Sequence, residues 1–244
     1  MQTKEEILKK CTIIKNVVQL PSGQLDRKLY QEVAKSLELI GGKWKGGNIF
    51  GFQFQSDPTE LLFEIANGEK RNLKKEFQFF ATPDDLADYL VELADIKWNN
   101  TILEPSAGQG AIIKAIERET SDMIIDYCEL MDINRIFLNK IKHAHFIGED
   151  FLKIPKGNMW NKIIANPPFR SDVIHIRKMY ECLKSGGRIV SIASKHWQLS
   201  KNKTETEFRE WLDEVGAEII DVEPGKFKES GTMVGSVIII INKK

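Results

Sequence analysis

Asn166, Pro167, Pro168 and Phe169 form the segment with the clearest chemical potential. They follow the apolar run Ile163–Ala165, which indicates a buried strand. Consecutive prolines fix the backbone and turn carbonyl groups outward, so the Asn166 amide oxygen and the Pro167 carbonyl could accept two hydrogen bonds from one planar amino group. Phe169 could stack on the ring that carries this group. The segment therefore suits an exocyclic amine that attacks a methyl group, and an ordinary Asn-Pro-Pro turn is the alternative.

A glycine loop forms the second candidate segment. Residues 102–110 indicate a buried strand that ends in Glu104, followed by small residues and a helix. Gly108 and Gly110 allow a sharp turn and a close approach of the backbone to a ligand. Ile113 stands where the dinucleotide-binding pattern has its third glycine, which disfavours a diphosphate-binding turn. A plain strand-to-helix turn remains the alternative reading.

Acidic residues follow the second and third predicted strands. Glu129 ends the strand Met123–Glu129 and stands 19 residues beyond Gly110. An acid at this place in a doubly wound sheet can accept both hydroxyls of a ribose, whereas helix capping or a surface position is the alternative. After the third strand, Asp150 could accept from an adenine amino group and Phe151 could pack on the ring. With the glycine loop, these residues predict a nucleoside site that has no phosphate to cradle.

From about residue 76 the sequence alternates between strand and helix patterns. Seven strands with intervening helices predict a doubly wound, mostly parallel α/β sheet. The expected strands cover residues 101–104, 123–129, 144–147, 162–165, 188–194, 218–222 and 236–242. The expected helices begin at Thr82-Pro83-Asp84-Asp85 and then cover residues 111–118, 134–142, 173–183 and 205–215. No clear helix separates the last two strands, so we expect them to pair as a hairpin.

Residues 1–75 are expected to form a separate, smaller α+β annex, and residues 76–244 the main domain. A helix is predicted over Leu25–Ile40, and a partly alternating pattern over Ile49–Gln55 indicates a strand. Asp57 is the expected N-cap of a second helix, with Pro58 in its first turn. The charged residues 69–75 are typical of a linker.

Charge is distributed unevenly beneath a formal net charge of +0. Residues 1–75 hold 13 basic and 9 acidic residues, a net of +4, whereas residues 76–170 hold 10 basic and 15 acidic, a net of −5. Residues 171–244 hold 12 basic and 11 acidic, a net of +1. The balance disfavours a strongly basic nucleic-acid binder, but it allows a polyanion to bind through a local patch in the annex.

Membrane, export and metal-binding readings have little support. The apolar run Val237–Ile241 is far shorter than the ~20 residues of a membrane span. The first residues carry acids and lack an apolar core, which argues against a signal peptide. Three scattered cysteines give no disulfide or zinc pattern, and a cytoplasmic protein is expected. His143 and His145 alternate on a predicted strand, and we expect no metal site there.

Five motifs in one order resemble S-adenosylmethionine-dependent DNA adenine-N6 methyltransferases of the gamma class, in the style of small phage or prophage members. The resemblance covers roughly residues 76–242. The motifs are Phe79-Phe80-Ala81-Thr82-Pro83, Glu104-Pro105-Ser106-Ala107-Gly108-Gln109-Gly110, Glu129, Asp150-Phe151-Leu152 and Asn166-Pro167-Pro168-Phe169. It implies a Rossmann-like class I methyltransferase fold, a DNA substrate and S-adenosylmethionine as the cofactor.

The resemblance also implies a role for individual residues. Asn166, Pro167, Pro168 and Phe169 would hold the target base. Residues that would contact the cofactor are Phe80, Thr82, Glu104, Ser106, Ala107, Gly108, Glu129, Asp150, Phe151 and Asn166. Residues 184–188 match the family's turn before the fifth strand, and Phe227 stands where a second base-packing aromatic is expected, although a core or loop-anchoring role for Phe227 is as plausible.

Sequence recognition departs from the family pattern, because relatives that read a specific site usually carry a long recognition region. Only 75 residues follow Phe169, and the sheet needs nearly all of them. Site reading is therefore expected to be short, relaxed, or assigned to the annex and loops. Candidate DNA contacts are Lys43, Trp44, Lys45, His196, Trp197 and Phe227. A tight turn around a core Trp44 is the alternative for the first three.

Three functions are consistent with these patterns. The first is transfer of a methyl group to the N6 amino group of adenine in DNA, after the base is flipped out of the stack. The second keeps the chemistry but changes the substrate, to ribosomal RNA bases or a protein glutamine. The third is a DNA-binding module with the fold but without catalysis, against which the intact motifs argue. A restriction endonuclease partner is left undetermined.

Overall fold

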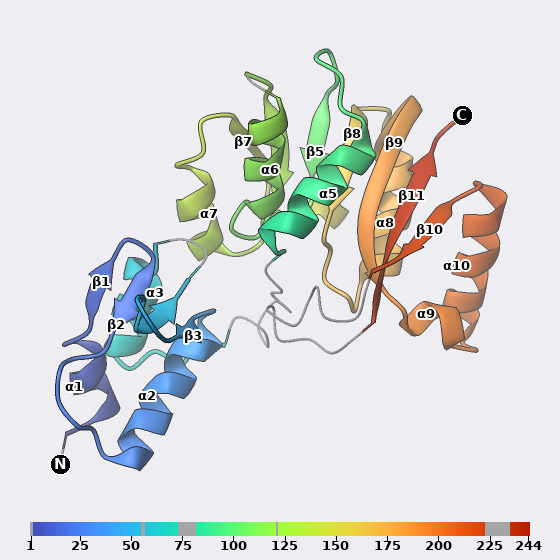
Figure 1. Cartoon of the computed structure of the whole chain (residues 1–244). Coiled ribbons are helices and arrows are strands. Elements are labelled where there is room, and N and C mark those ends of the chain that lie inside the picture. Colours follow the sequence, from blue (N-terminus) through green and yellow to red (C-terminus); the bar gives the residue numbers. More distant parts are fainter. Residues whose placement is uncertain (1, 55–56, 73–81, 121, 223–234) are drawn as a thin grey trace. The chain divides into compact units, whose positions relative to one another are not determined.

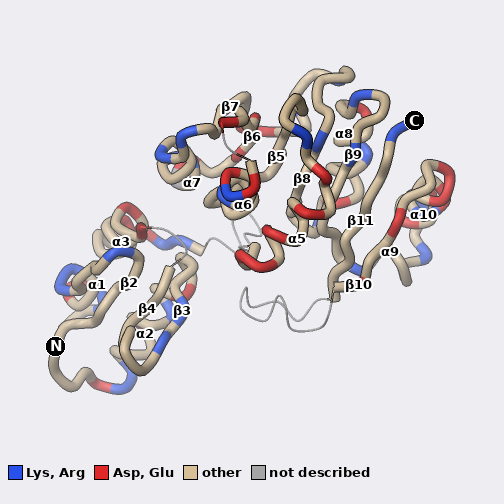
Figure 2. Tube along the Cα trace, turned by 45° about the horizontal axis from the view of Figure 1, so that its top comes forward, with Lys and Arg blue, Asp and Glu red and all other residues tan. Residues whose placement is uncertain are grey.

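The computed structural model describes residues 2–54, 57–72, 82–120, 122–222 and 235–244. The chain divides into two compact units, Met1–Phe79 and Phe80–Lys244. Each unit contains its own β-sheet (Figure 1). Lys and Arg residues are spread along both units rather than gathered in one of them (Figure 2).

The N-terminal unit combines an antiparallel sheet with helices. Its four strands pair in the order β1-β2-β4-β3. The described elements are α1 Lys4–Leu8, β1 Thr12–Ile14, β2 Val17–Gln19, α2 Arg27–Leu39, β3 Lys43–Lys45, β4 Gly51–Gln53 and α3 Thr59–Ala66. The predicted annex helices correspond to α2 and α3, and the predicted strand to β4. The sequence pattern misses α1, β1, β2 and β3, because elements of three to five residues are too short to show a period.

The start of α3 differs from its prediction by one residue. Its N-cap is Pro58 rather than Asp57, so the expected cap was wrong. The Asp57 carboxylate still accepts from the Thr59 backbone N–H at 3.0 Å and from the Thr59 hydroxyl at 2.6 Å. Asp57 therefore satisfies an open N–H of the first turn from outside the helix.

The C-terminal unit is built on a seven-stranded sheet with the order β10-β11-β9-β8-β5-β6-β7. Among the described strands, β11 runs antiparallel to both of its neighbours, β10 and β9, and the pairs from β9 to β7 are parallel. The strands are β5 Ile102–Glu104, β6 Ile125–Cys128, β7 Ala144–Gly148, β8 Trp160–Ala165, β9 Leu183–Ser194, β10 Glu218–Asp221 and β11 Ser236–Asn242. The predicted doubly wound sheet is confirmed, and so is the antiparallel pairing of its last two strands.

Helices cover both faces of this sheet (Figure 1). The described helices are α5 Asp84–Ala94, α6 Ala111–Glu119, α7 Asp132–Leu138, η1 Phe151–Lys153, α8 Asp172–Cys182, α9 His196–Leu199 and α10 Lys203–Glu214. On one face, Ile102 packs with residues of α5 and α6 such as Leu90 and Ile112. On the other face, Leu103 packs with residues of α8 and α10 such as Ile176 and Phe208. Successive strand residues thus serve two cores, as expected of a sheet buried on both sides.

The expected turn over residues 184–188 lies inside β9. The register of β8 and β9 shifts between Trp160, which pairs with Leu183, and Lys162, which pairs with Arg188. The extra residues of β9 form an irregularity in which Gly186 has φ +72°. The predicted fifth strand therefore begins five residues earlier than the alternation indicated. Among the described residues, no helix is long and apolar enough to cross a membrane.

Candidate active site

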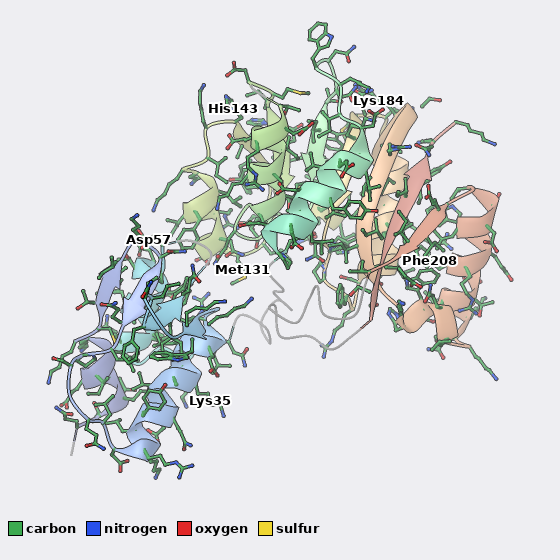
Figure 3. The ribbon with its side chains drawn as sticks, viewed as in Figure 1. Lys35, Asp57, Met131, His143, Lys184 and Phe208 are labelled. Atoms are coloured by element: carbon green, nitrogen blue, oxygen red, sulfur yellow. The ribbon has the colours of Figure 1, made fainter. Side chains whose placement is uncertain are left out.

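The predicted site residues gather at one edge of the seven-stranded sheet. β5, β6, β7 and β8 are parallel neighbours, so their carboxyl ends meet at that edge, where doubly wound sheets bind ligands. Met131, at the start of α7, lies at this edge in Figure 3, whereas His143 and Lys184 lie at the opposite edge. The residues at or directly after these carboxyl ends are Glu104, Glu129, Asp150 and Asn166.

The glycine loop connects β5 to α6 with two left-handed residues. Gly108 has φ +53° and Gly110 has φ +80°. A Cβ at Gly110 would lie 2.6 Å from Ile141 Cδ1, so packing as well as backbone conformation requires glycine there. Ala107 is buried, and its N–H donates to the Cys128 carbonyl at 3.0 Å, which ties the loop to the end of β6. Ser106 is half-buried beside it.

Glu129 is buried and holds the loop that follows β6 to the glycine loop. One carboxylate oxygen accepts from the Gly108 N–H at 2.7 Å. The other accepts from the Met131 N–H at 2.9 Å and from the Asn134 side chain at 3.2 Å. Burial raises the pKa of Glu129, and the N–H groups of Met131 and Gly108 oppose the rise. The Glu129 carboxylate is thus held against the glycine loop, at the carboxyl ends of the parallel strands.

Glu104 is a second buried carboxyl at the same edge, with 2% of its surface exposed. Burial raises the pKa of Glu104 well above its ordinary value, and the nearby Glu129 carboxylate raises it further. The Ile113 backbone N–H and the Lys114 ammonium act in the opposite direction. Glu104 Oε2 is buried and has no hydrogen-bond partner among the described residues. Two buried acids thus lie close enough to repel each other at this edge, an arrangement that added positive charge would stabilise.

Asp150 and Phe151 are placed differently from each other. Asp150 caps η1 and accepts from the Leu152 N–H at 3.0 Å, and its residue is half-buried. The Phe151 side chain is 2% exposed and packs in the core on the α8 face, with its ring 6.1 Å from that of His175. Asp150 is thus the more accessible of the two, and Phe151 anchors its turn.

Asn166 follows the last residue of β8 and is joined to the start of α5. Its Nδ2 donates to Thr82 Oγ1 at 3.0 Å across 84 positions of sequence. Because Nδ2 faces Thr82, the amide oxygen Oδ1 lies on the other side of the group. Thr82 is buried, and the N-cap of α5 is Pro83 rather than Thr82. The predicted helix start is confirmed. The Thr82 side chain does not cap the helix but accepts a hydrogen bond from Asn166.

The rest of the Asn166 loop is held by its own backbone. The Pro168 carbonyl accepts from the Ser171 N–H at 2.9 Å and from the Ser171 hydroxyl at 3.3 Å. The Pro167 carbonyl receives no hydrogen bond from the described residues. Phe169 is 9% exposed and packs in the core on the α5 face. The loop thus combines a braced backbone with a Pro167 carbonyl that no described residue occupies, on a proline that is itself buried.

A buried network after this loop was missed by sequence reasoning. Asp172, the first residue of α8, is 1% exposed and accepts from the Ser194 N–H at 2.9 Å and the Ser194 hydroxyl at 2.8 Å. The same hydroxyl also contacts His196 Nδ1. The available signal was an acid placed three residues after the Asn-Pro-Pro-Phe segment, but helix-start acids are usually exposed, which made it uninformative.

Two candidate DNA contacts after β9 have different environments. The His196 side chain is 44% exposed. Trp197 is 2% exposed and packs edge-on against Phe208, with ring centroids 5.3 Å apart. Its assignment as a DNA contact was wrong, because the indole fills the core between α9 and α10.

In the N-terminal unit, the three adjacent candidates do not share a surface. β3 pairs with β4 so that Trp44 lies opposite Phe52, and the lysines flank it in register. Side chains alternate along a strand, so Lys43 and Lys45 point to one face and Trp44 to the other. Trp44 is 41% exposed and contacts Phe50 and Phe52 with ring centroids 5.3 and 5.2 Å away. The alternative of a tight turn around a core Trp44 was wrong, because these residues form a strand and Trp44 is exposed.

Two candidates, Phe80 and Phe227, lie outside the described residues. Within the described part of the chain, no group of three or more His, Cys, Asp or Glu side chains could hold a metal ion. His143 Nδ1 lies 3.1 Å from Glu117, and His145 Nδ1 lies 2.8 Å from Asp126. The side chains of these histidines therefore contact carboxylates away from the candidate site.

Comparisons with known proteins find one curated sequence relative and many solved structures of similar fold. No family model matches the sequence. A curated protein named ribosomal RNA small subunit methyltransferase A, from Hydrogenobaculum sp., is 25% identical over 178 residues, which cover 70% of each chain.

Solved structures agree on the fold. The methyltransferase subunit of a type I restriction-modification system from Streptococcus thermophilus matches with a TM-score of 0.56 and 17% identity over 67% of this chain. This chain spans 44% of that subunit, less than half of its length. A candidate class I S-adenosylmethionine-dependent methyltransferase from Listeria monocytogenes matches with a TM-score of 0.54 and 15% identity, covering 76% of this chain and 67% of that one. The strand order and these similarities establish a Rossmann-like class I methyltransferase fold.

Proposed function

We propose that this protein transfers a methyl group from S-adenosylmethionine to the N6 amino group of adenine in DNA. The observation that carries the proposal is the hydrogen bond between Asn166 and Thr82, at the edge where Glu104 and Glu129 also lie. It joins the segment suited to an exocyclic amine to the Thr-Pro helix start of the related enzymes. The class I methyltransferase fold supports a cofactor at this edge.

Glu104 and Glu129 fit a cationic cofactor. S-adenosylmethionine supplies a methyl group activated on a positively charged sulfonium, and it also carries an ammonium group. Glu104 Oε2, buried without a partner among the described residues, offers the acceptor that such an ammonium needs. Burial raises the pKa of Glu104, and repulsion by the Glu129 carboxylate raises it further, so positive charge placed near the two acids would stabilise their ionised forms.

The remaining cofactor contacts follow the strand ends. Glu129 would accept ribose hydroxyls at its place after the second parallel strand. Its orientation is fixed by the Gly108 N–H of the glycine loop on one oxygen and by the Met131 N–H after β6 on the other. Asp150 would accept from the adenine amino group. Ser106, Ala107 and Gly108 would surround the methionine part, where small residues leave room for it.

Asn166 and Pro167 would hold the target amine. The amide oxygen of Asn166 and the carbonyl of Pro167 accept one N–H each, which keeps the nitrogen lone pair directed at the methyl carbon. S-adenosylmethionine would supply the methyl group, and the new N–C bond would form as the C–S bond breaks, with the electron pair of that bond left on sulfur. The product amine then loses one proton to water. Phe169, at the rim of the core, would pack against the base.

A flipped base is part of the proposal, because the N6 amino group lies inside the duplex stack and a protein loop cannot reach it there. Lys43 and Lys45 share one face of the edge strand β3 and would contact phosphate groups. Residues 1–75 hold 13 basic and 9 acidic residues, a net of +4, which supports phosphate contacts from this part of the chain.

Ribosomal RNA is the second candidate substrate. The curated relative at 25% identity is named a ribosomal RNA small subunit methyltransferase, and it matches over 70% of its own length. The same Asn166 loop would hold an exposed amino group of RNA without flipping from a duplex.

A methyl-transfer assay with parallel substrates separates the two. Purified protein is incubated with tritiated S-adenosylmethionine and either unmethylated duplex DNA or small ribosomal subunits, and the labelled nucleosides are identified. Label in N6-methyladenine of DNA supports the proposal. Label confined to ribosomal RNA would replace DNA with the second candidate, and label in neither would contradict both.

A further inference from the structure

A buried carboxylate stands three residues after the loop that would hold the target base. Asp172 begins α8, and its side chain is enclosed, with 1% of the residue exposed. Its Oδ1 accepts from the Val173 N–H at 2.7 Å, and its Oδ2 accepts two hydrogen bonds from Ser194. Burial raises the pKa of Asp172, and the donors of Ser194 oppose the rise. Because Asp172 is the acceptor in each of these hydrogen bonds, they stabilise its ionised form.

Ser194 connects this carboxylate to the end of β9. Its hydroxyl donates to Asp172 Oδ2, so the hydroxyl oxygen is left to accept from Nδ1–H of His196. His196 begins α9, and its Nε2 lies 3.8 Å from Glu205 on α10. The chain of contacts therefore joins the start of α8, the end of β9 and the start of α9.

The Asn166 loop is thus fastened on both sides. On one side, Asn166 donates to Thr82 at the start of α5. On the other, the chain passes through Ser171, which is bonded to the Pro168 carbonyl, into Asp172. Because β8 and β9 are neighbouring parallel strands, Ser194 lies at the same carboxyl end as Asn166. Asp172 therefore fixes the exit of the loop to the adjacent strand.

Helix formation alone does not explain this arrangement. An acid in the first turn of a helix gains its electrostatic benefit at the surface, whereas burying a carboxylate requires its hydrogen bonds to replace water. Asp172 obtains these bonds from a neighbouring strand rather than only from its own helix. Hydrogen bonds between the start of α8 and the end of β9 would fix the position of the loop that precedes α8.

We propose that Asp172 and Ser194 are positioning residues that hold the Asn166–Phe169 loop in the geometry required for methyl transfer. This role rests on the proposed function of that loop. Neither residue touches the substrate. They act through Asn166 and Pro167, whose acceptors must lie within hydrogen-bond distance of one amino group while its nitrogen faces the methyl carbon.

The test compares Ser194→Ala with Ser191→Ala. Both serines are buried on β9, but the Ser191 hydroxyl bonds to the Ile192 carbonyl and not to Asp172. We expect Ser194→Ala to lower kcat by about 10- to 100-fold while KM for DNA and the Kd of S-adenosylmethionine stay within about twofold. Ser191→Ala is expected to keep kcat, with a similar change in Tm.

Asp172→Asn is a second, independent test. An amide nitrogen in place of Oδ2 could not accept from Ser194, so the hydrogen bond with the Ser194 hydroxyl would have to run in the opposite direction. Its matched control is Asp126→Asn on β6, which loses the carboxylate that accepts from Trp160 Nε1 at 2.7 Å. We expect kcat to fall for Asp172→Asn alone, and Ser194→Ala decides the question if Asp172→Asn does not fold.

The outcomes separate this role from the proposed function. If the wild type methylates DNA or RNA and Ser194→Ala is as active as Ser191→Ala, the positioning role is overturned and the proposed function stands. If the wild type transfers no methyl group to either nucleic acid, both are overturned. A selective loss of kcat in Ser194→Ala, on whichever substrate the wild type uses, supports the positioning role.

Discussion

Asn166 Nδ2 lies 3.0 Å from Thr82 Oγ1, and this hydrogen bond connects the loop after β8 to the start of α5. In this bond the amide nitrogen of Asn166 faces the threonine, so the amide oxygen lies on the other side of the group. Two segments that are separated by 84 positions are thereby aligned at one sheet edge. Under the proposed function, the bond places the acceptor of the target base beside the cofactor site.

Removing the threonine oxygen should therefore impair transfer. Thr82→Val keeps the branched shape but cannot accept from Asn166, and we expect kcat to fall about tenfold, as for the loss of one well-formed hydrogen bond. Steady-state methyl transfer measures the change. Thr82→Ser, which retains the oxygen, is the control and should stay within about threefold of the wild type. Equal activity of the valine and serine variants would show that the bond has no part in the reaction.

Cofactor binding should depend on pH through Glu104. Burial and the Glu129 carboxylate raise the pKa of Glu104, so the acid loses its proton only as the pH passes well above its ordinary range. We expect the affinity for S-adenosylmethionine to increase as the pH rises, because the cationic cofactor favours the ionised acid. Glu104→Gln should bind more weakly at about pH 8 and show a flatter dependence, measured by calorimetry. The same slope in both proteins would contradict this assignment.

The unliganded protein should show the opposite trend in stability. A carboxyl whose pKa is raised in the folded state stabilises the fold below its unfolded pKa, and that contribution is lost as the pH rises through the folded pKa. Glu104→Gln should therefore gain stability relative to the wild type between about pH 5 and pH 8. Urea unfolding without cofactor measures the difference. Parallel pH curves for the two proteins would show that Glu104 is not the responsible group.

Gly110 should tolerate no side chain. Its φ of +80° is strained for other residues, and a Cβ would stand 2.6 Å from Ile141 Cδ1. Gly110→Ala is expected to cost about 2–5 kcal/mol of unfolding free energy, from the left-handed backbone and from overpacking together. Gly216→Ala is the control, since Gly216 has φ +67° with open space around it. That variant should lose only about 1–2 kcal/mol, and equal losses would show that the contact with Ile141 carries no cost.

Lys43 and Lys45 should contribute to DNA binding through phosphate contacts. Changing both to Ala should weaken binding and lower the slope of log affinity against log salt by about 2, one for each lysine. Fluorescence anisotropy over a range of salt concentrations gives this slope. Trp44→Phe, which changes the opposite face of β3, should leave the slope unaltered. An unchanged slope in the double lysine variant would move the DNA surface elsewhere.

The sequence predicts the main sheet well, because its central strands are apolar and several of them are followed by clear helix starts. The start of β9 is the exception, since residues 184–187 carry glycines and no alternation and join the strand only through a register shift. In the N-terminal unit, β1, β2 and β3 are three residues each and their pairing is set by the tertiary fold.

The site is predictable in part for a physical reason. Glu104, Glu129 and Asn166 end parallel strands, so their common edge follows from topology alone. The Asp172–Ser194 contact joins residues 22 positions apart through a buried hydrogen bond, which leaves no periodic signal. The burial of Trp197 was also unpredictable, because its place after β9 gave no indication that α9 and α10 enclose it.

The most direct test of the central claim is methyl transfer by the wild type and by Asn166→Ala to unmethylated DNA, with identification of the labelled nucleoside. We predict N6-methyladenine with the wild type and a loss of about 100-fold or more in Asn166→Ala, while S-adenosylmethionine still binds. Near-normal turnover in Asn166→Ala, or wild-type label found only in RNA or protein, would contradict the account.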